Sequence, residues 1–383
     1  MASVGIPKET FPGERRVALV PELLAEMKKR GLDVVVEKGA GEQAGFPDAA
    51  YTEKGARIGS RDEVFAADTI LCIRCAGANP EHAKDDLTRL SERQTLIGLA
   101  DPLGQPGHAL ELATTGARLF ALELLPRTTR AQAMDVLSSM ATVAGYKSVL
   151  LAAERLPRLF PMLVTAAGTV TPARVLVVGA GVAGLMAIAT AKRLGAVITA
   201  YDVRPAVKQE VESLGAKFLE LGLEGGAGEG GYAKVMDEGF YERQRRLLGE
   251  AVAQSDVVIT TASVPGKPAP RLLTAATVRA MRPGSVIVDL GAERGGNCEL
   301  TKPGKTVEES GVSILGPTNV PSTVPYDASR MFARNLRNFL FHLLDAKAED
   351  EILRESLVTR DGNVVHARVR EALGSPQPPS IST

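Results

Sequence analysis

The sequence contains few of the residues that build disulfide frameworks and metal centres. Its three cysteines are Cys72, Cys75 and Cys298, and it has only four histidines. So few cysteines predict a reducing compartment and no disulfide framework. Cys72 and Cys75 have the spacing of a redox pair, but they fall in an expected strand, where residues three apart face opposite sides. No two histidines have a metal-ligand spacing, so we expect no zinc or iron site.

The sequence also lacks an excess of charge and a long hydrophobic run. Its 45 basic residues balance 45 acidic residues, which argues against nucleic acid or an anionic membrane surface as the main partner. No run of about eighteen apolar residues occurs, and the first residues lack the apolar core of a signal peptide. We therefore expect a soluble intracellular chain, with any membrane link supplied by another subunit.

What the sequence does contain is a glycine-rich fingerprint between two expected strands. The four-residue apolar run Val175–Val178 is followed by Gly-Ala-Gly-Val-Ala-Gly and then by an apolar helical pattern. In such a turn the first glycine permits the tight bend, the second admits a pyrophosphate and the third lets the helix approach the sheet. The positive end of the helix favours the anion. The predicted dinucleotide-binding residues are Gly179, Gly181, Val182 and Gly184.

An acidic residue at the end of the next strand indicates which dinucleotide binds. Asp202 follows the expected strand and can accept hydrogen bonds from an adenosine ribose. Its charge would repel a 2′-phosphate, which favours NAD(H) over NADP(H). Arg204 lies two residues further on and could bind the 2′-phosphate of NADP(H), because a guanidinium pairs well with a phosphate. NADP(H) therefore stays open as the alternative.

Alternating extended runs and helical patterns predict an α/β protein of two domains, each with a largely parallel sheet. We expect strands over residues 32–37, 70–73, 95–100 and 118–123, and then over 174–178, 196–202, 255–262, 285–289 and 312–315. Long helices over about 130–155 and 327–344 would join the domains. The first domain would comprise 1–144 and 326–383, and the second, a doubly wound Rossmann fold, 145–325, with the cofactor site in a cleft between them.

A second glycine-rich stretch has no secondary-structure pattern. Six of the ten residues 222–231 are glycine, and Tyr232 and Met236 follow them. Such a run does not hold one backbone conformation at low cost, which suits a flexible surface insertion. The alternative is a mobile loop over 222–238 that covers a bound nicotinamide with Tyr232 and Met236. Both interpretations stay open on the sequence.

Polar residues cluster just before the second domain. Arg127 follows a proline, and Gln132, Asp135 and Ser138 have spacings that place them on one helix face. Thr129 and Gln132 match a capping box, which predicts a helix from about Arg130. A solvent-exposed polar face explains these residues equally well when their spacing is considered alone.

At this point the sequence resembles a known family along essentially its whole length: the NAD(H)-binding subunit of proton-translocating nicotinamide nucleotide transhydrogenase, which is related to alanine dehydrogenase. The matching segments are Ile6–Thr10, Gly13–Ala18, Pro126–Ser138, the fingerprint, Pro265–Pro270, Val288–Asn297 and Thr318–Ser322. The segment that contains Arg127, Gln132 and Asp135 is the most specific of these, because it is similar to the family's hydride-transfer loop.

The resemblance implies roles for individual residues. Arg127, Asp135 and Ser138 would hold the nicotinamide carboxamide and ribose, and Gln132 would reach towards NADP(H) presented by another subunit. Tyr146 would line the site, Tyr232 would sit on the mobile loop, and Asp202 would bind the adenosine ribose. The implied partners are an NADP(H)-binding subunit, one or more membrane-spanning subunits and a second copy of this chain. The protein would then lie in the cytoplasm at the inner face of a membrane, held there by its partners.

Two other functions remain as hypotheses. A stand-alone amino-acid dehydrogenase of the alanine dehydrogenase type would need a proton-accepting base, yet the strand ends at 73–76 and 96–100 contain neither lysine nor histidine. Arg15 remains from the shared pattern without an assigned role, and Glu293 stands where that enzyme type usually has aspartate. A non-catalytic NAD-sensing protein, whose glycine-rich loop orders to dock a partner, is the third possibility. Hydride exchange between two nicotinamide rings needs positioning and no base.

Overall fold

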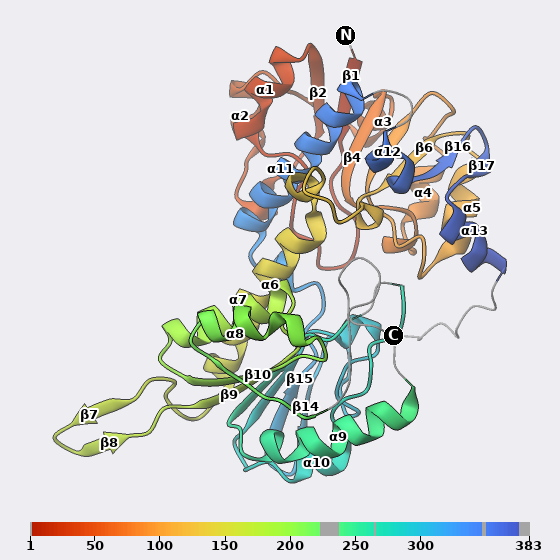
Figure 1. Ribbon diagram of the computed structural model, residues 1–383. Helices are drawn as coiled ribbons and strands as arrows, with labels where there is room; N and C mark the ends of the chain where they lie inside the picture. Colours follow the sequence, from red (N-terminus) through yellow and green to blue (C-terminus); the bar gives the residue numbers. More distant parts are fainter. Residues whose placement is uncertain (1, 223–236, 264–265, 347–349, 375–383) are drawn as a thin grey trace. The chain divides into compact units, whose positions relative to one another are not determined.

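The computed structural model describes residues 2–222, 237–263, 266–346 and 350–374. The chain folds into two compact units (Figure 1). Unit 1 comprises residues 1–140 and 321–382, and unit 2 comprises 141–320. The chain crosses between them within α6 (Val136–Arg155) and again at the turn Val320–Thr323, directly before α11 (Pro325–Asp345).

Unit 1 contains an eight-stranded sheet with the order β17-β16-β6-β5-β4-β1-β2-β3. The parallel strands are β1 (Ala2–Ile6), β2 (Leu32–Glu37), β3 (Arg57–Gly59), β4 (Thr69–Arg74), β5 (Thr95–Leu99) and β6 (Arg118–Ala121). The C-terminal strands β16 (Leu357–Arg360) and β17 (Asn363–Val364) extend the sheet in antiparallel fashion, which the sequence patterns did not predict. Its short helices are α1 (Leu24–Lys29), α2 (Asp48–Glu53), α3 (Arg61–Phe65), α4 (Ala83–Leu87), α5 (Pro106–Ala113), α12 (Glu351–Ser356) and α13 (Ala367–Gly374).

Unit 2 contains a seven-stranded sheet with the order β11-β10-β9-β12-β13-β15-β14. Its strands are β9 (Arg174–Val178), β10 (Val197–Tyr201), β11 (Lys217–Phe218), β12 (Val257–Thr260), β13 (Val286–Asp289), β14 (Thr306–Glu309) and β15 (Val312–Leu315), and only β14 is antiparallel to its neighbour. Its helices, besides most of α6, are α7 (Val182–Arg193), α8 (Lys208–Ser213), α9 (Glu238–Ala253) and α10 (Ala275–Arg279). Without β14, the order is that of a doubly wound dinucleotide-binding sheet.

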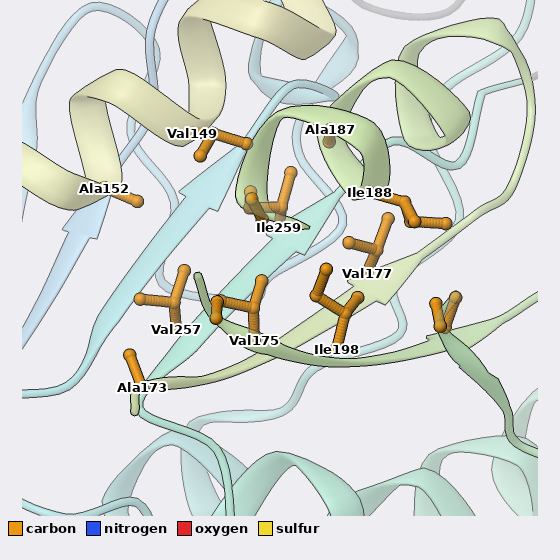
Figure 2. Close-up of a cluster of buried hydrophobic side chains, with 14 of the residues drawn as sticks. Val149, Ala152, Ala173, Val175, Val177, Ala187, Ile188, Ile198, Val257 and Ile259 are labelled. Carbon is orange, nitrogen blue, oxygen red and sulfur yellow. The ribbon is translucent and has the colours of Figure 1, made fainter. Parts of the chain in front are cut away.

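Both faces of the second sheet are buried because its strands are nearly continuous apolar runs. On β9, Val175 and Val177 join the core formed with α6 and α7, and Figure 2 shows them beside Val149, Ala152 and Ile188. The alternate β9 side chains, Leu176 and Val178, belong to a separate core on the other face. This two-sided burial is typical of parallel sheets between helix layers. The predicted α/β fold with two largely parallel sheets is confirmed.

The predicted strands are present, and their ends differ from the predicted ones by at most two residues. The first long helix is different: it begins at Val136, whereas the capping-box pattern predicted Arg130. Among the described residues, α6 is the one helix whose length and mean hydropathy would allow it to cross a membrane. Its inner side chains Val149 and Ala152 are buried in the core of unit 2.

The sequence patterns also did not predict β1, β3, β11 and β14, nor a hairpin of β7 (Leu163–Thr165) and β8 (Gly168–Val170). Every residue of both strands is exposed, and the hairpin extends away from the sheet of unit 2 (Figure 1). An isolated pair of strands is only marginally stable in water. Pairing of β7 with β8 therefore contributes little stability to the hairpin.

One buried carboxyl group makes the stability of unit 1 depend on pH. The Glu123 Oε1 atom accepts hydrogen bonds from the Ala100 and Asp101 amides, at 2.8 and 2.5 Å. The Oε2 atom is buried, and no described residue donates a hydrogen bond to it. Burial raises the pKa of Glu123 to about 7, and the charge of Asp101 adds to the rise, while the amides oppose it.

We expect Glu123→Gln to flatten the dependence of unfolding free energy on pH. Glutamate in the unfolded chain titrates near pH 4.5, so between pH 4.5 and about 7 the folded protein binds more protons than the unfolded chain. Stability from this group is therefore lost as pH rises through that interval, by roughly 3 kcal/mol. Urea unfolding at several pH values checks this. The exposed Glu53→Gln is the control, and parallel curves for the wild type and Glu123→Gln would contradict the prediction.

Candidate functional site

The glycine fingerprint forms the turn between β9 and α7 in unit 2. Gly179 has φ +98°, a left-handed conformation that disfavours residues with a side chain. Thr261, just after β12, donates its hydroxyl hydrogen bond to the Gly179 carbonyl at 2.9 Å. A Cβ atom on Gly184 would lie 1.8 Å from the same carbonyl oxygen, so the third glycine is required by helix packing. The sequence predicted these two glycines correctly but gave no signal for Thr261.

The second glycine is different, because no described neighbour lies close enough to exclude a side chain there. A Cβ atom on Gly181 would lie 4.0 Å from its nearest heavy atom, the Arg204 Nη2 atom. Gly181 is also the N-cap of α7, and no side chain there accepts a hydrogen bond as a cap of that helix. Val182, the first helical residue, is 38% exposed. Uncapped amides beside open space at a helix N-terminus fit a pyrophosphate.

Asp202 and Arg204 lie against the same turn. The Asp202 Oδ2 atom accepts a hydrogen bond from the Ala180 amide at 2.7 Å, between the first two glycines. The Arg204 guanidinium donates to both oxygens of Asp202, from Nε to Oδ1 at 2.9 Å and from Nη2 to Oδ2 at 2.8 Å. Asp202 is only 9% exposed. The turn, Asp202 and Arg204 are thus one connected cluster, in which the carboxylate neutralises the arginine next to it.

The polar segment of unit 1 has a different local structure from the one predicted. Gln132–Met134 forms a single 3₁₀ turn, and Asp135 has an extended ψ of 93° that separates this turn from α6. The Asp135 carboxylate accepts hydrogen bonds from the Ser138 amide at 2.9 Å and the Ser138 hydroxyl at 2.5 Å. Asp135 therefore caps α6, and the expected capping box of Thr129 and Gln132 is wrong. Aspartate, with its charged acceptor, is one of the strongest N-caps.

The remaining predicted residues are distributed over both units. Arg127 and Gln132 are exposed and belong with Asp135 and Ser138 to unit 1. Tyr146, which is 42% exposed, belongs with the glycine turn to unit 2. Tyr232 and most of the glycine-rich loop 222–238 lie outside the described residues.

The sheet of unit 1 repeats the parallel order of unit 2, yet charged side chains fill the position after its first strand. Glu9 follows β1, and its carboxyl group accepts hydrogen bonds from the Ile73 and Arg74 amides at the end of β4, at 2.6 and 3.2 Å. Burial raises the pKa of Glu9 to about 8, and the charge of nearby Glu14 adds to the rise. Backbone donors that could have bound a ligand are therefore occupied by the protein itself.

A buried ion pair lies beside Glu9. The Arg16 guanidinium donates to both carboxylate oxygens of Glu14, at 2.7 and 2.6 Å, and both side chains are almost fully buried. Burial alone would raise the pKa of Glu14, but the hydrogen bonds and charge of Arg16 outweigh it and lower that pKa to about 2. Arg74 lies 3.5 Å from Glu14 and covers the ring of Phe11. The sequence pattern singled out Arg15, whereas Arg16 is the buried arginine.

The two cysteines of the CxxC motif belong to one buried core, although an uninterrupted strand would place them on opposite faces. The pairing of β4 with β5 shifts register between Leu71 and Arg74, so β4 ends before Cys75. Both thiols are buried, and the hydrogen bond with Cys75, together with burial, raises the pKa of Cys72. The predicted separation on opposite faces is therefore wrong. A buried thiol with a raised pKa is nonetheless unreactive. The described residues contain no group of three or more potential metal ligands.

Nearly the whole chain is similar in sequence and in structure to known proteins. In Rhodospirillum rubrum, the protein named as the first part of NAD(P) transhydrogenase subunit alpha is 46% identical over 375 residues, covering 95% of this chain and 97% of that protein. The alanine dehydrogenase of Halomonas elongata is 30% identical over 389 residues, covering 97% and 96%. The crystal structure of a transhydrogenase from Sinorhizobium meliloti matches with a TM-score of 0.84 and 43% identity, covering 95% of this chain and 99% of that one.

Family models match both halves of the chain. The alanine dehydrogenase/PNT N-terminal domain matches residues 5–144, and the corresponding C-terminal domain matches residues 148–367. The second match includes the glycine turn, Asp202 and Arg204, and the first includes the segment from Arg127 to Ser138. The chain, with its two Rossmann-like sheets and one glycine-rich nucleotide turn, belongs to the alanine dehydrogenase/PNT family.

Proposed function

We propose that this chain is the NAD(H)-binding component of a proton-translocating nicotinamide nucleotide transhydrogenase. Hydride passes directly between NAD(H) on this chain and NADP(H) on a partner subunit, and a membrane-spanning component couples the exchange to proton movement. The observation that carries the proposal is that two sheets share one strand order, but only unit 2 has a glycine turn open to a nucleotide among the described residues. In unit 1, Glu9 instead follows the first strand and accepts hydrogen bonds from the Ile73 and Arg74 amides at the end of β4. A reaction of two nucleotides then needs a second protein.

NAD(H) binds to the cluster around the glycine turn. Gly181 leaves room for the pyrophosphate, and the amides of Val182 and its neighbours at the start of α7 donate to it. Asp202 binds the adenosine ribose and exchanges part of its contact with Arg204 for the ribose hydroxyls. Because that carboxylate repels a 2′-phosphate, the site selects NAD(H). When bound, the nicotinamide ring supplies the hydride donor or acceptor.

The segment that leads into the first turn of α6 supplies the residues that act at the nicotinamide. Arg127, Asp135 and Ser138 hold the carboxamide and ribose, and Gln132 extends towards the partner's NADP(H). Tyr146 lines the site. These residues position two rings and move no proton, because a hydride carries both electrons and its proton together. The reaction therefore requires close approach of the two reacting carbons and no base.

The alternative of a stand-alone amino-acid dehydrogenase has one supporting observation, the 30% identity to an alanine dehydrogenase. It requires NAD⁺ reduction by an amino acid without a second protein. The end of β4 opposes it, because Arg74 there lies against Glu14 and Phe11 and is no proton acceptor. A non-catalytic NAD sensor would bind NADH and transfer hydride to no acceptor.

The exposed hairpin supports assembly of two copies of this chain. Five large apolar side chains on or beside it are 38 to 76% exposed: Leu159, Met162, Leu163, Val164 and Val170. A marginal hairpin with such a surface gains stability when another protein covers it. A second copy can present the same apolar surface in return, which is the geometry of a twofold dimer. The dimer would lie at the cytoplasmic face of the membrane through its partner subunits.

Gln132→Ala should slow hydride transfer while NADH still binds. The exposed amide extends from the 3₁₀ turn without a role in the fold, so its loss changes the approach of the two nucleotides and lowers the rate by ~10- to 100-fold. Stopped-flow transhydrogenation with the purified NADP(H)-binding partner measures the rate. The exposed Gln209→Ala in unit 2 is the matched control. Absence of exchange in the wild type, with both nucleotides bound, would defeat the proposed function.

Asp202→Asn should reduce the preference for NADH over NADPH. The amide oxygen can still accept from Ala180, but the charge that repels a 2′-phosphate is gone and Arg204 loses its counter-ion. We expect the ratio of the two dissociation constants to fall at least tenfold, which is about 1.4 kcal/mol. Equilibrium dialysis with each nucleotide measures it, with the exposed Asp33→Asn as control. An unchanged ratio would rule out Asp202 as the selecting residue.

Val164→Lys should convert the dimer to monomers. Val164 is the most exposed of the hairpin side chains at 76%, and burying an unpaired charge in an apolar interface is costly. Analytical ultracentrifugation gives the mass of the wild type and the variant. Val197→Lys, at a valine that is 55% exposed on β10, is the matched control. A dimer that survives Val164→Lys would place the interface elsewhere.

A further inference from the structure

The segment that contains Arg127, Gln132 and Asp135 is held by residues from the far end of the sequence. Two amides on α11 converge on one carbonyl group: Asn335 Nδ2 donates to the Ala133 oxygen at 2.9 Å, and Asn338 Nδ2 donates to the same oxygen at 2.8 Å. Asn335 and Asn338 are three residues apart and so lie on one face of the helix. The Ala133 carbonyl thereby has both of its lone pairs occupied by side-chain donors.

A second contact from the same region holds the segment at Arg130. Arg130 Nη2 donates to the Asp350 Oδ2 atom at 2.7 Å, and His342 Nε2 lies 2.9 Å from the Asp350 Oδ1 atom. Asp350 also caps α12, because its Oδ1 atom accepts from the Ile352 and Leu353 amides. Asp350 is therefore fixed from several sides, although the Arg130 side chain itself is 66% exposed.

These contacts differ in what they would contribute. The ion pair between Arg130 and Asp350 contributes little to the free energy of unfolding, because the Arg130 side chain is mostly exposed. Asn335 is buried, and its Oδ1 atom has no hydrogen-bond partner among the described residues, so its amide serves the Ala133 carbonyl alone. A buried amide with an unsatisfied oxygen is costly for the fold. The buried position of Asn335 is explained if the orientation of the Ala133 peptide group has to be held constant.

We infer that Asn335 and Asn338 are positioning residues for hydride transfer, an inference that rests on the proposed function. The Ala133 peptide lies between Gln132 and Asp135, so fixing its carbonyl fixes the direction in which both side chains leave the backbone. Buried Ala131 and Met134 anchor the segment without setting its rotation, since apolar contacts are not directional. The two amides, which together we call the amide clamp, supply that direction.

The test removes the donors but keeps the shape. Aspartate matches asparagine in size and has no hydrogen to donate when ionised, so Asn335→Asp and Asn338→Asp replace attraction to the carbonyl by repulsion. We expect each variant to lower the single-turnover hydride-transfer rate at least tenfold and to change the NADH dissociation constant less than threefold. Asn338→Gln keeps the donor and should retain more activity than Asn338→Asp. The exposed Arg334→Ala on the same helix should behave like the wild type.

A readout independent of activity comes from amide hydrogen exchange. Loss of the clamp should speed exchange at residues 131–135, while exchange in β9 and α7 stays unchanged. Should Asn335→Asp fail to fold, the half-buried Asn338→Asp carries the test alone. Clamp variants that transfer hydride at the wild-type rate would overturn the inference. If the wild type itself is inactive with its partner, the proposed function fails, and unchanged exchange at 131–135 would still refute the clamp.

Discussion

The close contact between the start of α7 and the end of β9 is the constraint on which the nucleotide turn depends. Gly184 admits the Gly179 carbonyl because it has no Cβ atom, and Thr261 and Asp202 then bind the carbonyl and the amide of the peptide group between Gly179 and Ala180. A larger residue at position 184 would push the helix away from the sheet and break these contacts together. The direction of the α7 amides follows from this packing, as does the open space at Gly181.

The two units share one strand order but place different groups after the first strand of the sheet. In both sheets the chain reverses its winding beside the first strand, which is where ligands collect in such folds. Unit 2 places glycines and uncapped amides there, and unit 1 places Glu9, Glu14 and Arg16. The charged group in unit 1 satisfies itself internally, since Arg16 neutralises Glu14 and burial favours a protonated Glu9. Fold alone therefore does not make a site.

Local sequence patterns predicted the features that depend on contacts between residues close together in the sequence. The glycine turn depends on residues within one strand, turn and helix, and Gly179 and Gly184 have the roles that their spacing indicated. The start of α6 was misplaced because two capping signals compete within seven residues and the charged acceptor of Asp135 is the stronger. The separation of Cys72 and Cys75 was wrong because a register shift belongs to the strand pair and leaves no trace in either strand.

The remaining features depend on residues distant in the sequence, which no spacing rule can connect. Thr261, just after β12, binds Gly179, and Asn335 binds Ala133 from 202 positions further along the chain. During synthesis, a chain that has not yet reached Pro321 already contains the glycine turn and the whole segment from Arg127 to Ser138, yet none of the residues that grip Ala133. A nascent chain of that length would hold the segment from Arg127 to Ser138 without the two amides that bind the Ala133 carbonyl. Those contacts would form only as translation nears its end.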